Sequence, residues 1–200
     1  MTRCIISVGA IAVATAVAPL GAQSLADVRK QYDAGQYQQV VGAQSSQDPR
    51  VLYLVGQAAQ KASRPDEARK AYGQLAARPG SDPWHGVGGS ALALLASDTA
   101  GAVQAANEAV ARGGSLAEAF YQQGLALSVK QDMTAAAAAF QKATELDPGW
   151  SYAHYYAGLA YSKIKRVDLT ASHFQTFLKI APDAPEKPEV QSILKTLGAR

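Results

Sequence analysis

The chain has 200 residues, of which 48% are hydrophobic and only 8% aromatic, so alanine supplies much of its apolar content. Such a composition favours closely packed helices over sheets. The formal net charge of +3 at neutral pH is too small to indicate nucleic acid or a membrane surface as a partner. A single cysteine, Cys4, excludes a disulfide within the chain.

The first 22 residues have the features of a secretory signal peptide. Arg3 carries one positive charge, and the apolar stretch that follows it carries none. Pro19 and Gly21 interrupt that stretch just before Ala22, a small residue of the kind that a signal peptidase accepts. We therefore expect cleavage near Ala22 and a periplasmic or secreted protein. The alternative is an uncleaved membrane anchor, which needs about 20 apolar residues without such an interruption.

The rest of the chain is predicted to form a single domain of helix pairs that end in a capping helix. Asp48-Pro49 and Asp82-Pro83 each start a helix, with aspartate as the N-cap and proline at the first helical position. Ser115 and Glu118 have the spacing of a capping box, which predicts a third such start. The expected pairs span residues 24–47, 49–80, 83–113, 117–148 and 151–182, and the capping helix spans about 186–197.

The third pair departs from the others, because its first helix contains Gly86, Gly88 and Gly89. Each glycine costs about 1 kcal/mol relative to alanine in a helix interior. A phosphate-binding glycine loop is excluded, since no strand precedes these glycines and their spacing is not that of a nucleotide fingerprint. We therefore expect a degenerate repeat whose first helix is soft or starts late.

Internal repetition is the strongest signal in the sequence. A shift of 34 residues places Gly124 on Gly158, Leu125 on Leu159, Phe140 on Phe174 and Pro148 on Pro182. The pattern Phe120-x2-Gln123-Gly124-x2-Leu127, then Ala136-x3-Phe140, then Pro148, resembles the tetratricopeptide repeat. This resemblance implies an all-α, right-handed superhelix of about five helix-turn-helix repeats.

In the tetratricopeptide family, one stripe of each first helix lines a concave groove that takes extended peptides or helices. The corresponding residues here are Arg50, Tyr53, Lys61, Trp84, Glu118, Tyr121, Leu125, Tyr152, Tyr155, Leu159 and Lys163. Tyrosine recurs in one column, and its ring and hydroxyl suit partner binding. The alternative is that these rings pack against the neighbouring repeat.

The best-known ligand of such arrays is the acidic C-terminus of heat-shock chaperones, held by a clamp of lysines, asparagine and arginine. At the clamp positions this chain has Tyr53, Gln57, Ala91, Glu118 and Gln122, so we do not expect that partner.

Chemistry beyond binding is not indicated. His154 and His173 lie on the two predicted helices of one repeat, but a zinc site needs three or four ligands and no third is evident. No nucleophile with a positioned base is visible. We therefore expect no metal, no cofactor and no catalysis.

The leading interpretation is an exported, monomeric interaction module that binds a protein or peptide partner, with no nucleic acid and no membrane insertion after cleavage. The alternative is an envelope protein that self-assembles through its short first repeat. There Val28, Tyr32 and Val40 would be poorly covered.

Overall fold

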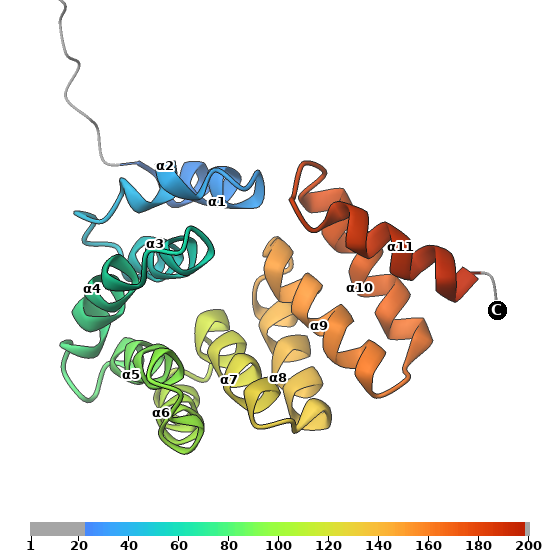
Figure 1. The fold of residues 1–200 in the computed structure, drawn as a ribbon. Helices are drawn as coiled ribbons and strands as arrows, with labels where there is room; N and C mark the ends of the chain where they lie inside the picture. The colour runs from blue at the N-terminus through green and yellow to red at the C-terminus, as the bar shows by residue number, and fades with distance from the viewer. Residues whose placement is uncertain (1–22, 199–200) are drawn as a thin grey trace, which may run out of the picture.

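The computed structural model describes residues 23–198, so the predicted signal peptide lies outside the described residues. This part of the chain forms eleven α-helices, which pack as successive antiparallel pairs in a helical solenoid (Figure 1). The helices are α1 (Leu25–Asp33), α2 (Tyr37–Val41), α3 (Pro49–Lys61), α4 (Pro65–Ala76), α5 (Pro83–Leu95), α6 (Thr99–Arg112), α7 (Ala117–Val129), α8 (Met133–Leu146), α9 (Ser151–Lys163), α10 (Val167–Ile180) and α11 (Lys187–Gly198).

Aspartate side chains cap four of the helices. The carboxylates of Asp48 and Asp82 accept hydrogen bonds from the backbone N–H two residues on, at 2.9 and 3.0 Å. Those of Asp98 and Asp132 accept from the N–H three residues on, at 2.9 and 3.1 Å. The expected capping box before α7 is not formed. Leu116 takes the N-cap position there, because a turn closed by its N–H to the Gly113 carbonyl shifts the helix start beyond Ser115.

Glycines lie where the two helices of a repeat cross. A Cβ atom on Gly124 would come within 2.6 Å of the Phe140 ring, and one on Gly158 within 2.6 Å of the Phe174 ring. Both phenylalanines are completely buried. The glycine and the phenylalanine that recur in each repeat are therefore in contact, and the glycine leaves room for the ring because it has no side chain.

Helix α5 is continuous from Pro83, so the expectation of a late start is wrong. Its glycines allow close approach on both sides. A Cβ on Gly86 would lie 2.7 Å from the Ala105 carbonyl oxygen of α6, and one on Gly88 would lie 2.7 Å from the Tyr72 carbonyl oxygen of α4. The glycines reduce intrinsic helix propensity, but tight packing against two neighbouring helices compensates for that loss.

The array curves until its two ends meet (Figure 1). The ring of Tyr32 on α1 lies edge-on to that of Tyr152 on α9, with centroids 4.8 Å apart. In the turn between α1 and α2, Gly35 lies against the side chain of Pro185, which precedes α11. The first repeat therefore packs into the concave side of the solenoid, and its residues Val28, Tyr32 and Val40 are buried.

Helix α11 covers the last repeat. Val190 is fully buried, and Ile193 and Leu194 pack against the core, while Gln191, Lys195 and Thr196 face solvent. This amphipathic pattern is what the end of a repeat array requires. Within residues 23–198, none of the helices has the length and apolarity needed to span a membrane.

Candidate functional site

The tyrosines predicted to line a groove are buried. Tyr53, Tyr121 and Tyr152 are at most 1% exposed, and Trp84 and Tyr155 are 7% exposed. The Tyr121 ring lies 4.3 Å from the ring of Trp150, measured between centroids. The expectation of partly exposed rings is therefore wrong for this column. The physical reason is the curvature of the array, which brings successive repeats and the two ends over the same rings.

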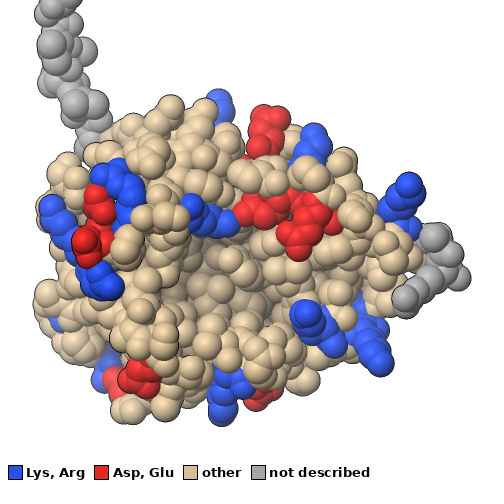
Figure 2. Space-filling model, in the orientation of Figure 1, with Lys and Arg blue, Asp and Glu red and all other residues tan. Residues whose placement is uncertain are grey.

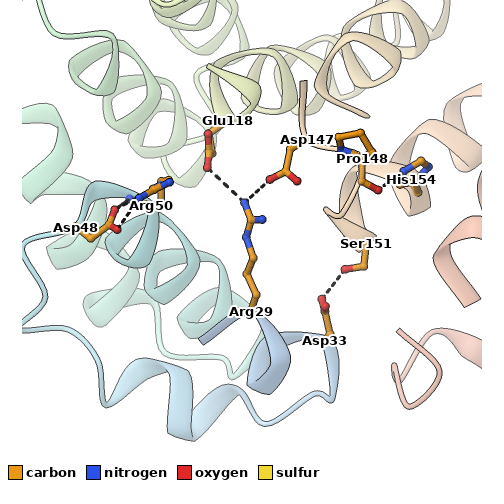
Figure 3. A network of polar contacts seen from close by, with 9 residues as sticks. All are labelled: Arg29, Asp33, Asp48, Arg50, Glu118, Asp147, Pro148, Ser151 and His154. Carbon is orange, nitrogen blue, oxygen red and sulfur yellow. Dashed lines mark hydrogen bonds and ion pairs between the residues drawn. The ribbon is translucent and has the colours of Figure 1, made fainter. Parts of the chain in front are cut away.

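The remaining predicted groove residues lie in separate surroundings, and Figure 3 shows two of them, Glu118 and Arg50, in different polar contacts. Glu118 is buried beside Arg29, and Arg50 turns back to pair with its own capping residue, Asp48, at 3.1 Å. Leu159 is half-buried against the core, and Lys163 is exposed at the end of α9. Only Lys61, Tyr121 and Leu125 of the predicted set face one common space.

That space is a central hollow of about 290 Å³ on the concave side (Figure 2). It is lined by Tyr32, Gln57, Gln60, Lys61, Tyr121, Leu125 and Tyr156, from helices α1, α3, α7 and α9. Figure 2 shows uncharged side chains over most of its wall and both signs of charge at its rim. Sites for drug-sized ligands have volumes from about 300 Å³ upwards, so this hollow has room for one large side chain or a short turn.

Lys61 lies at the edge of the hollow and is held in place by an acid and two aromatic rings. Its Nζ is 2.6 Å from Glu186 and 4.9 Å from the centroid of the Tyr152 ring. Burial disfavours the charged form of Lys61, but the hydrogen bond to Glu186 and the nearby charges together outweigh burial, so the pKa of Lys61 is raised. Tyr152 donates to the same carboxylate at 2.7 Å. The charge of Lys61 at the edge of the hollow is therefore balanced by that of Glu186.

One polar group in the lining lacks a partner. The Oε1 atom of Gln57 is buried and accepts no hydrogen bond from any of residues 23–198. Gln122, by contrast, accepts from Tyr53 at 2.6 Å and donates to Ser90 at 3.1 Å, so that amide is satisfied. An unpaired buried acceptor costs about 1–3 kcal/mol.

The predicted groove set omits four of the seven lining residues, although Gln57 was placed at one of the family's clamp positions. Gln57 and Gln60 lie on the face of α3 that carries Lys61, so helical spacing from Lys61 could have suggested them. Tyr156 was not predicted, because the repeat alignment placed its neighbour Tyr155, and not Tyr156, in the groove column. Tyr32 could not be predicted from the sequence, because α1 lines the hollow only as a result of the contact between the two ends of the array.

The two histidines of the last repeat do meet. Their Nδ1 atoms are 3.0 Å apart, and the Nε2 of His154 lies 3.2 Å from the Pro148 carbonyl oxygen. Burial, followed by the charge of His154, lowers the pKa of His173 to about 4. Residues 23–198 contain no group of three histidine, cysteine or acidic side chains that could hold a metal ion.

Comparison with known proteins agrees with the repeat pattern. The sequence profile of the tetratricopeptide repeat matches residues 21–83, 90–151 and 121–185. No curated protein sequence matches the chain. Among solved structures, TTC0263, a thermophilic tetratricopeptide protein of Thermus thermophilus, superimposes with a TM-score of 0.62 at 16% identity, covering 88% of this chain and 97% of that one.

Two further structures share the fold. The TPR2AB domain of yeast Sti1, solved in complex with pHSP90, has a TM-score of 0.53 at 13% identity, over 88% of this chain and 86% of that one. MamA has a TM-score of 0.50 at 18% identity, over 79% of this chain and 95% of that one. The repeated glycine–phenylalanine crossings, the stacked helix pairs and the profile matches lead to one conclusion: the chain belongs to the tetratricopeptide repeat family.

Proposed function

We propose that this protein is a non-catalytic adaptor that holds a partner protein by a protruding side chain or short turn inserted into the central hollow. The single observation that carries the proposal is the hollow itself. It is a space on the concave side whose wall includes the aromatic side chains of Tyr32, Tyr121 and Tyr156.

The size of the hollow decides between modes of binding. An extended peptide needs a continuous open groove, but here α1 and the segment before α11 close over the concave side. A space of about 290 Å³ instead suits one anchor residue. Single aromatic or arginine anchors commonly dominate the energetics of protein interfaces, with about 2 kcal/mol or more each. The Sti1 domain in complex with pHSP90 supports the fold's capacity to hold a protein ligand.

The test is a charge placed in the wall of the hollow. Leu125 is half-buried and lines it, so Leu125→Arg should fill the space and lower partner recovery about tenfold or more, as the loss of one anchor predicts. Recovery would be measured by affinity capture from the organism's envelope extract, with quantitative mass spectrometry of the retained proteins.

The matched control is Gln74→Arg, which adds the same charge at an exposed position of α4 outside the hollow. This variant should capture as much partner as the parent protein. Circular dichroism melting of both variants must show a folded array. Equal recovery by the two variants would exclude the hollow as the binding site.

The self-assembly alternative assumed that Val28, Tyr32 and Val40 are poorly covered. These side chains are buried within the chain, so they do not support self-assembly.

For cellular location we propose export followed by cleavage near Ala22, supported by the apolar, uncharged run that precedes this residue. The rival is an anchor that stays uncleaved. N-terminal sequencing of the protein recovered from envelope fractions distinguishes the two, since only cleavage yields a chain beginning near Gln23.

A further inference from the structure

The contact between the two ends of the array differs in kind from the contacts between neighbouring repeats. Neighbouring helices pack closely through alanine, glycine and ring side chains. Across the junction, long polar side chains make ion pairs and hydrogen bonds (Figure 3), alongside the ring contact of Tyr32 with Tyr152. We call this set of contacts the clasp: Arg29 with Asp147 and Glu118, Asp33 with Ser151, Tyr37 with Tyr152, and Lys61 with Glu186.

The clasp is incompletely packed. A partly open pocket of about 460 Å³ borders it, lined by residues of α1 and by residues 180–183 at the end of α10 and just beyond it. The Nε of Arg29 is buried there without a hydrogen-bond partner among the described residues. A gap and an unsatisfied buried polar group weaken this contact relative to the close-packed ones between neighbouring repeats, so it should open at a lower free energy than they do.

The clasp closes over the hollow. Tyr32 of α1 forms part of the hollow's wall, and Lys61 forms part of both the wall and the clasp. Separation of the ends would remove Tyr32 from the wall and uncover Tyr152, which is now fully buried. The same movement would widen the entrance to the hollow. Access to the proposed binding site is therefore coupled to the state of the clasp.

Protonation of Asp33 favours the closed clasp. Burial raises the pKa of this carboxyl from 3.8 to about 6, although the hydrogen bond from Ser151 and the charge of Arg29 act in the opposite direction. Glu186 faces Asp33 and adds to the rise, while Lys30 and Asp183 line the same pocket.

In an open state Asp33 would regain its ordinary pKa, so the closed state binds the proton more tightly. Protonated Asp33 therefore contributes free energy to the closed state. This contribution is fully present below the ordinary pKa and is lost as the pH rises through about 6. Glu118 acts in the same direction, because burial also raises its pKa.

We propose that the clasp is a gate that acid favours closed: its ends separate to admit the partner to the hollow, and the Asp33 carboxyl, held across the junction by Ser151, responds to pH. The binding part of this statement rests on the proposed function, whereas the opening itself does not. The gate needs no movement within the repeats, since only side-chain contacts across the junction have to break.

The opening can be measured without any partner. Cysteines replacing the exposed residues Gln36 and Lys179, in the full chain carrying Cys4→Ser, allow a short-range fluorophore pair to be placed across the junction. Between pH 5 and pH 7.5 the ratio of closed to open molecules should fall about tenfold, which is the change expected for one carboxyl with this shift. Salt at 1 M should open the clasp further, since the Arg29–Asp147 pair is partly exposed.

Asp33→Asn is the decisive variant, because it keeps the shape and removes the charge. It should stay closed over the range in which Asp33 titrates and keep only the part of the step that Glu118 contributes. The control, Asp27→Asn, changes an exposed carboxyl of the same helix and should keep the full step. Both variants retain His154 and His173, so the difference between them isolates Asp33. Far-ultraviolet circular dichroism at each pH checks that the helices remain formed.

An energy transfer that does not change with pH would overturn the gate, and so would a step of equal size in Asp33→Asn. If the clasp opens as expected but Leu125→Arg captures as much partner as the control, the gate stands and the proposed function fails. If partner capture depends on the hollow but not on pH, only the gate fails.

Discussion

Replacing Tyr121 and Tyr155 together with alanine is expected to bring the protein close to unfolding. Both rings are buried, and that of Tyr121 contacts the rings of Phe140, Trp150 and Tyr156. Truncation of a buried aromatic side chain costs about 3–5 kcal/mol. Two such losses approach the entire stability of a typical domain, about 5–15 kcal/mol. Urea unfolding followed by circular dichroism measures the loss.

The control is the double variant Tyr121→Phe, Tyr155→Phe, which keeps both rings and removes only the hydroxyls. The Tyr155 hydroxyl donates to Glu189 at 3.1 Å, a partly exposed contact whose loss should cost about 1 kcal/mol. A double alanine variant that melts with the parent protein would show that the rings face solvent. The burial of the tyrosine column would then be wrong.

Alanine substitutions at two helix glycines should change stability in opposite directions. At Gly158 the added Cβ would lie 2.6 Å from the Phe174 ring, so Gly158→Ala should overpack the crossing and cost about 1–3 kcal/mol. At Gly73 of α4 nothing lies within 4 Å of the added atom. Gly73→Ala should therefore stabilise the protein by about 0.5–1 kcal/mol, through the better helix propensity of alanine.

The same denaturation experiment measures both glycine variants, and each serves as the control for the other. If both variants lose stability equally, the helices do not cross at Gly158 as described. A gain at both positions would lead to the same conclusion.

The sequence predicted those parts of the fold that depend on local rules. Aspartate followed by proline located the starts of α3 and α5, because the N-cap and the first helical position have specific residue preferences. The recurrence of glycine and phenylalanine located the helix crossings, since a crossing needs a small residue opposite a ring. The amphipathic pattern of the last segment indicated an end cap, and α11 covers the last repeat.

Most of the candidate site could not be predicted from the sequence, because the site depends on the curvature of the repeat array. A repeat pattern fixes how one helix pair packs on the next, but small rotations per repeat add up over the array. Whether Tyr121 and Tyr152 face a groove or a packed interior depends on that sum. Here the sum brings Tyr32 against Tyr152 and Gly35 against Pro185, contacts between residues more than 100 positions apart.

The glycines of α5 show a second limit. Intrinsic propensity predicted a weak helix, because Gly86 and Gly88 each lower helix stability when considered alone. Tertiary contact reverses the outcome, since both sides of α5 pack at distances that no Cβ would permit. A single sequence does not show whether a glycine weakens a helix or permits a close neighbour.

The central claim is that the two ends of the array meet and thereby limit the entry of a partner into the hollow. A disulfide between Asp33→Cys and Ser151→Cys, in the full chain carrying Cys4→Ser, tests this most directly, since these side chains touch across the junction. At a pH near 5, mild oxidation should produce a monomer with one internal disulfide and faster mobility on a non-reducing gel. Two free thiols in the monomer, or only disulfide-linked dimers, would contradict the closed array.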